Sequence, residues 1–71
     1  MKEMTEASPL YHTHRIKGML RDLVHHLRED VHAVREPKAQ ALFETSAEVL
    51  SGLVEAFEHY EKKSEEAWQT T

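Results

Sequence analysis

The stretch HHLREDVH, residues 25 to 32, holds the side chains best suited to chemistry in this chain. One turn of a helix brings together side chains three or four positions apart, so His25 with Glu29, and Glu29 with His32, can each chelate one ion. The stretch therefore allows a transition-metal site for zinc, nickel or iron, made by His25, Glu29 and His32, with His14 as a further candidate.

The spacing Glu29-x-x-His32 also occurs in di-iron carboxylate bundles, where these ligands project into the core and meet carboxylates from facing helices. Here the helical period turns His25, Glu29 and His32 away from the apolar stripe of their helix, by roughly 140 to 160°. Structural zinc sites usually have four ligands, so completion would need another chain. We therefore favour a solvated helix face, and keep metal binding as the alternative.

His26 lies elsewhere, on the shoulder of the apolar stripe, with Asp30 one turn further on. Shoulder positions of a bundle face a neighbouring helix or another subunit. A His26–Asp30 pair at an interface would respond to pH through the histidine. The alternative is a half-buried histidine with all its hydrogen bonds satisfied.

The composition limits the class of protein. A chain of 71 residues is one small domain at most, and without cysteine it has no disulfide to stabilise it, which favours self-association. Its net charge of −4 disfavours nucleic acid as a partner. It contains no apolar run long enough for a signal peptide or a membrane span, so we expect a cytoplasmic protein.

The elements that carry HHLREDVH are two predicted helices. Ser8-Pro9 has the form of an N-cap followed by proline at the first helical position. Apolar residues then recur at steps of three and four, which predicts a helix over 9–35, a turn at 36–37 and a helix over 37–67. Residues 1–8 and 69–71 are expected to be polar tails around a hairpin of residues 9–68.

A short turn makes the helices antiparallel and pairs positions whose numbers sum to roughly 73. The predicted pairs are Ile16 with Phe57, Leu20 with Leu53, Leu23 with Leu50, and Val31 with Leu42. Both apolar stripes are wider than a two-stranded seam needs. The predicted fold is all-α, an antiparallel two-helix hairpin that assembles into a dimeric four-helix bundle.

A single hairpin would leave some apolar side chains partly exposed, and these are the expected interface residues. Together with the shoulder pair they are Met19, Val24, His26, Asp30, Phe43, Val54 and Trp68. Trp68 is either an anchor for a partner protein or a cap on the open end of the hairpin near Leu10 and Tyr11.

Nothing in the sequence has the parts of a catalytic apparatus, such as a glycine-rich phosphate loop or an activated nucleophile. We therefore expect a non-enzymatic helical protein without a cofactor, which self-associates and acts through protein contacts as an adaptor or regulatory subunit. Its protein partner is not identified by the sequence. The alternative function is a metal-binding helical bundle.

Overall fold

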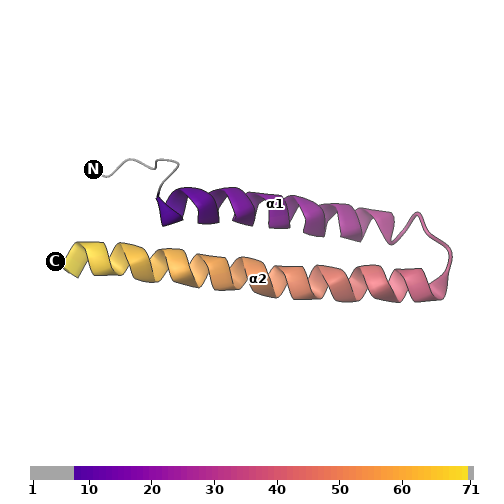
Figure 1. Ribbon diagram of the computed structural model, residues 1–71. Helices are drawn as coiled ribbons and strands as arrows, with labels where there is room; N and C mark the ends of the chain where they lie inside the picture. The colour runs from indigo at the N-terminus through magenta and orange to yellow at the C-terminus, as the bar shows by residue number, and fades with distance from the viewer. Residues whose placement is uncertain (1–7, 71) are drawn as a thin grey trace.

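The computed structural model describes residues 8 to 70, and side chains as far as Lys63. Its two helices, α1 (Pro9–Asp30) and α2 (Pro37–Thr70), lie side by side and antiparallel (Figure 1). The described residues contain no strand, and their helices pack against each other over most of the length of α1. The predicted all-α helical hairpin is therefore confirmed. None of the described helices is long and apolar enough to cross a membrane.

The start of α1 follows the predicted capping pattern. Ser8 has an extended backbone conformation, and its Oγ accepts a hydrogen bond of 3.2 Å from the backbone N–H of Leu10. Pro9 takes the first helical position, where its missing N–H leaves no hydrogen bond unmade. The side chain of Ser8 thus satisfies one of the donors that every helix start exposes.

The end of α1 comes at Asp30, five residues before the predicted Arg35. Beyond Asp30, backbone hydrogen bonds join residues three positions apart. The N–H of His32 donates to the carbonyl of Glu29, and the N–H of Ala33 donates to the carbonyl of Asp30. Such bonds between residues three apart tighten and end a helix. The predicted boundary was wrong because the chain needs residues 31–36, rather than a two-residue turn, to cross to α2.

Side-chain and backbone hydrogen bonds also mark the start of α2. The carbonyl of Glu36 accepts a hydrogen bond of 3.0 Å from the N–H of Gln40, so Glu36 precedes the first turn, and Pro37 begins it. The Gln40 side chain donates through Nε2 to the carbonyl of Val34, at 2.9 Å. Gln40 thereby connects α2 to the segment that precedes it.

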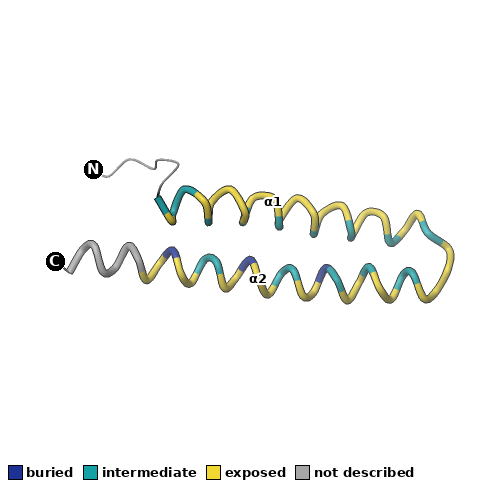
Figure 2. The backbone as a smooth tube through the Cα atoms, viewed as in Figure 1, coloured by how far each residue is buried: buried dark blue, intermediate teal, exposed yellow. Residues whose placement is uncertain are grey.

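The seam between the helices buries few side chains completely. Among the residues whose side chains are described, only Ala47, Val54 and Glu61 are buried, and the other residues that face the seam are half-buried (Figure 2). These half-buried apolar residues include Leu20, Val24, Leu27, Val31, Phe43, Leu50 and Phe57. One hairpin therefore has only a thin core.

The predicted side-chain pairs need correction in one way. Ile16, Leu23, Leu42 and Leu53, which were expected inside the seam, are each more than two fifths exposed. The hydrogen bond from Thr13 to Glu61 joins positions whose numbers sum to 74, close to the predicted register, and long side chains such as that of Arg21, which pairs with Glu58, reach further along the hairpin.

Candidate protein-interaction surface

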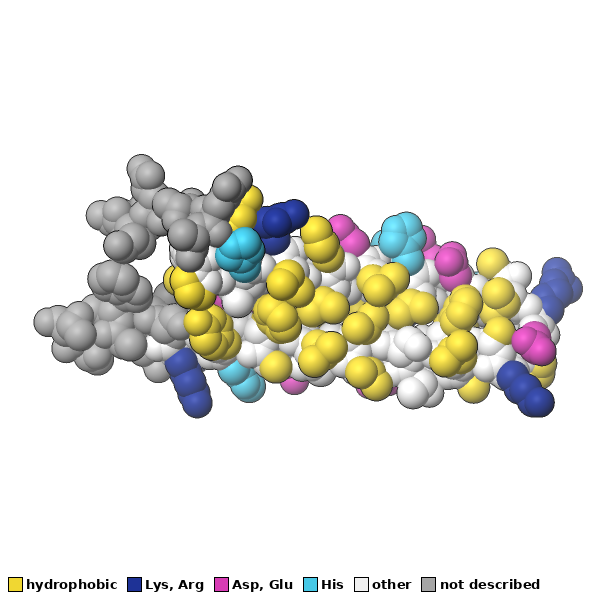
Figure 3. All heavy atoms as spheres, viewed as in Figure 1, with side chains coloured by type: hydrophobic (Ala, Val, Ile, Leu, Met, Phe, Trp, Pro, Cys, Tyr) yellow, Lys and Arg dark blue, Asp and Glu magenta, His cyan; other side chains and the backbone are white. Residues whose placement is uncertain are grey.

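One face of the hairpin carries its exposed large hydrophobic residues. Seven such side chains are 43 to 62% exposed: Ile16, Met19, Leu23, Leu42, Val49, Leu53 and Tyr60. We call this set the apolar face. In Figure 3 hydrophobic side chains form a band along both helices on the side turned to the viewer.

The helical period explains why both helices contribute to the same face. On α1, Ile16 and Leu23 lie about 40° and 60° to one side of Leu20, which faces the seam. On α2, Leu53 lies about 60° from the seam residue Leu50 in the same sense of rotation. Because the helices are antiparallel, the same rotation leads to the same face of the hairpin, so the two sets of exposed side chains adjoin.

The apolar face is hollowed between the helices. An open groove of about 400 Å³ is lined by Leu23, Leu27, Thr45, Ser46, Val49 and Leu50. The small side chains of Thr45 and Ser46 leave room beside the larger leucines. A groove of this kind can accept side chains that project from another helix, as knobs enter holes in helical bundles.

Ion pairs connect the helices on the opposite side of the seam. Arg21 pairs with Glu58, and the Arg28 guanidinium lies 3.9 Å from a carboxylate oxygen of Glu48 and 3.4 Å from the Ser51 hydroxyl. Arg21 and Arg28 lie about 80 to 100° from Leu20, opposite in sense to Ile16. The hairpin is therefore two-sided, with an apolar face and a charged face.

Among the side chains that the structure describes, Glu61 is the most enclosed polar group, with only 6% of its residue surface exposed. Its carboxylate accepts hydrogen bonds of 2.7 Å from the Thr13 hydroxyl and 2.7 Å from the Lys17 ammonium, and the His14 ring nitrogen Nδ1 lies 3.6 Å away. Burial alone raises the pKa of Glu61. The hydrogen bonds from Lys17 and Thr13, with the positive charges of His14 and Lys17, outweigh burial and lower this pKa below its ordinary value.

This cluster was not predicted, although its positions carry a signal. Glu61 continues the seam row of α2 one helical repeat beyond Val54, and Thr13 and Lys17 continue the row of α1 beyond Leu20. Polar residues at seam positions on both helices, at the same end, indicate a buried polar cluster. Among the described side chains, an ion pair and a hydrogen bond to Glu61 thus join the two helices near the open end of the hairpin.

The polar residues of HHLREDVH stay on the surface, while its Leu27 and Val31 are half-buried at the seam. His25 Nε2 lies 3.0 Å from a carboxylate oxygen of Glu29, and both side chains are well exposed. His32 is also exposed, and His14 lies at the Glu61 cluster instead. Within the described part of the chain, no group of three or more His, Asp or Glu side chains is arranged to hold a metal ion. Of the predicted ligand pairs, the structure brings together only His25 and Glu29.

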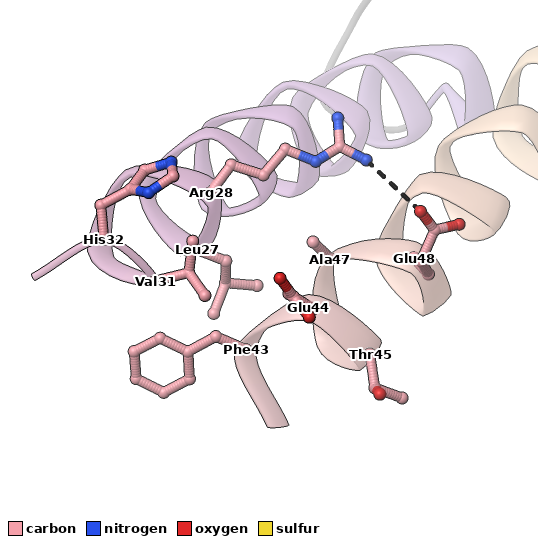
Figure 4. A pocket seen from close by; sticks show the side chains of 9 residues that line it. All are labelled: Leu27, Arg28, Val31, His32, Phe43, Glu44, Thr45, Ala47 and Glu48. Carbon is pink, nitrogen blue, oxygen red and sulfur yellow. Dashed lines mark ion pairs between the residues drawn. The ribbon is translucent and has the colours of Figure 1, made fainter. Parts of the chain in front are cut away.

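His32 does line a second hollow, near the connection between the helices (Figure 4). This hollow of about 580 Å³ is open to solvent, and Arg28 and Glu48 face each other across it. Its remaining lining comes from Leu27, Val31, Phe43, Glu44, Thr45 and Ala47. An ion pair already links its two walls.

The expected interface residues whose side chains are described fall into three groups. Met19, His26 and Asp30 are exposed, and no ion pair joins His26 to Asp30 among the described side chains. Val24 and Phe43 are half-buried in the hairpin. Val54 is buried, with 9% of its surface exposed, so the expectation that a single hairpin leaves Val54 partly exposed was wrong. The side chain of Trp68 lies outside the described residues.

Comparisons of this chain with protein-family models, with curated proteins and with solved structures found no match.

Proposed function

We propose that this chain is a non-enzymatic helical protein that acts through protein contacts, and that its working form is a homodimer in which two apolar faces pack into a four-helix bundle. The apolar face carries this proposal. It is continuous over both helices and adjoins the thin core of the hairpin.

The size of the apolar face fits a second copy of the chain. With roughly 100 Å² of each side chain still exposed, its seven residues offer about 700 Å², close to the about 800 Å² that each partner contributes to a standard protein interface. Packing a second hairpin there would also enclose Leu20, Leu27 and Leu50, which the seam leaves half-buried. One contact would thus complete the core of both copies.

The charged faces would remain outside such a bundle. The ion pairs of Arg21 and Arg28 with α2 are exposed, and exposed pairs contribute only about 0 to 1 kcal/mol each. Their contribution is to the orientation of the helices more than to stability. The outward surface, with its paired charges and its histidines, is then what an adaptor or regulatory subunit presents to other proteins.

Sedimentation equilibrium of the full chain over a range of concentrations tests the dimer. The expected species has twice the 8.3 kDa mass of the chain. A monomer at every concentration up to several hundred micromolar would rule out the proposed working form.

A further inference from the structure

The second hollow, on the charged face near the connection, has two walls of opposite chemistry (Figure 4). Arg28 and His32 form one wall, which we call the α1 wall, and Glu44 and Glu48 form the other, the α2 wall. Between the walls, seam residues of both helices form an apolar floor: Leu27, Val31, Phe43 and Ala47. The hollow therefore combines hydrogen-bond donors, carboxylates and apolar surface within about 580 Å³.

The four polar residues of the walls lie at two matching levels of the hairpin. Contacts elsewhere between the antiparallel helices join positions whose numbers sum to 74 to 79. Arg28 and Glu48, which sum to 76, are 3.9 Å apart. His32 and Glu44 have the same sum, so they face each other one helical turn nearer the connection. Each wall thus repeats its chemistry at the spacing of one turn.

Much of the hydrogen-bonding capacity of the walls is unused. The Arg28–Glu48 contact of 3.9 Å is too long for a hydrogen bond, and the contact from Arg28 to the Ser51 hydroxyl is 3.4 Å. Within the described part of the chain, the side chains of His32 and Glu44 make no hydrogen bond or ion pair. Both walls can therefore accept new partners without the loss of a strong contact.

The shape of the hollow suits a protein segment better than a small molecule. Small-molecule sites enclose most of the surface of their ligand, whereas this hollow is open to solvent. A helix presents side chains of one kind at steps of three and four residues, which is the spacing of both walls. Helices that bind in grooves use apolar side chains at the same steps as their anchors.

We propose that this hollow binds an amphipathic helix of another protein, which lies along the seam on the charged face. Apolar side chains one turn apart on that helix contact the floor. Carboxylates along one flank accept hydrogen bonds from the α1 wall, and basic side chains along the other flank pair with the α2 wall. The proposal rests on the proposed action through protein contacts and not on the dimer, because the charged face stays outside the dimer.

A set of three synthetic helical peptides tests the charge pattern. The probe is a fluorescein-labelled, alanine-based peptide of roughly 20 residues, with leucines one turn apart, glutamates along one flank and lysines along the other. One control peptide has glutamate on both flanks, and the other has lysine on both, so each sets like charges against one wall. Fluorescence anisotropy with the full chain should show the probe binding at least about fivefold more tightly than either control.

Two substitutions in the chain test where the probe binds. Glu44→Lys reverses the charge at one position of the α2 wall, and the Glu44 side chain is exposed, so the hairpin keeps its own contacts. This variant should bind the probe at least about fivefold more weakly. Glu55→Lys is the matched control, because it makes the same charge change at an exposed position of α2 that does not line the hollow. The control should bind the probe as the unaltered chain does.

The proposal is supported if the unaltered chain prefers the probe and only Glu44→Lys weakens binding. Equal affinities for the three peptides, equal effects of the two substitutions, or no binding at about 1 mM chain would overturn it. If Glu44→Lys alters the sedimentation of the chain and Glu55→Lys does not, the hollow is occupied by a second copy, which also overturns it. Sedimentation of the unaltered chain tests the dimer separately, so failure of the hollow and failure of the dimer are distinguishable.

Discussion

Leu53→Ala removes part of the apolar face and should weaken the proposed dimer. In the hairpin, 44% of the Leu53 surface is exposed, and burying that share of a leucine in the dimer stabilises it by about 1 kcal/mol. The substitution acts in both copies, so association loses about 2 kcal/mol, which is roughly a 30-fold rise in the dissociation constant. Alanine favours helix, so the change keeps the backbone of α2.

Sedimentation equilibrium over the same concentrations for both chains measures this rise. Glu55→Ala is the matched control, because Glu55 is an exposed residue of α2 that does not belong to the apolar face. The control should leave the dissociation constant unchanged. If Leu53→Ala and Glu55→Ala both dimerise as tightly as the unaltered chain, the apolar face is not the contact and the reasoning fails.

Three further outcomes concern the hairpin itself. Glu61→Ala leaves the Lys17 ammonium and the Thr13 hydroxyl without their acceptor and should cost about 1–3 kcal/mol in urea unfolding, and an unchanged midpoint would contradict the buried cluster. Because the pKa of Glu61 is lowered in the fold, its stabilisation should be complete above the ordinary glutamate pKa of about 4.3 and be lost as pH falls through the lower folded value. The unaltered chain should therefore lose more of its melting temperature on acidification than Glu61→Gln does, whereas parallel pH profiles would speak against the lowered pKa. Gly18→Ala should stabilise α1 by about 0.5–1 kcal/mol, seen as a higher melting temperature, since the new methyl group meets no neighbour; a lower melting temperature would show a contact at this position that the structure lacks.

The hairpin was predictable from local signals, because each helix start has its own chemical mark. Ser8 and Pro9 define the start of α1, and the pair Glu36-Pro37 defines the start of α2. The end of α1 was not predictable from periodicity alone. Val31 and Val34 keep the helical spacing although they lie beyond Asp30, because they pack at the seam from a non-helical segment.

The division of apolar residues between the seam and the apolar face was also beyond the sequence. Leu20 and Leu23 are separated by only about 60° around α1, and a broad apolar stripe does not say which edge faces α2. The exposure of His25, Glu29 and His32 was predicted correctly, since these residues lie far enough from the stripe for a small change in register to leave them outside.

Native mass spectrometry of the untagged chain, prepared without chelator and offered zinc, nickel, copper and iron in turn, tests the central claim most directly. The account predicts a species of twice 8.3 kDa that carries no stoichiometric metal, because the contact is made by apolar side chains. A monomer alone would contradict the proposed assembly. An oligomer that forms only with a fixed number of ions, and that is lost when His25 and His32 are replaced by alanine, would make the histidines the functional centre instead.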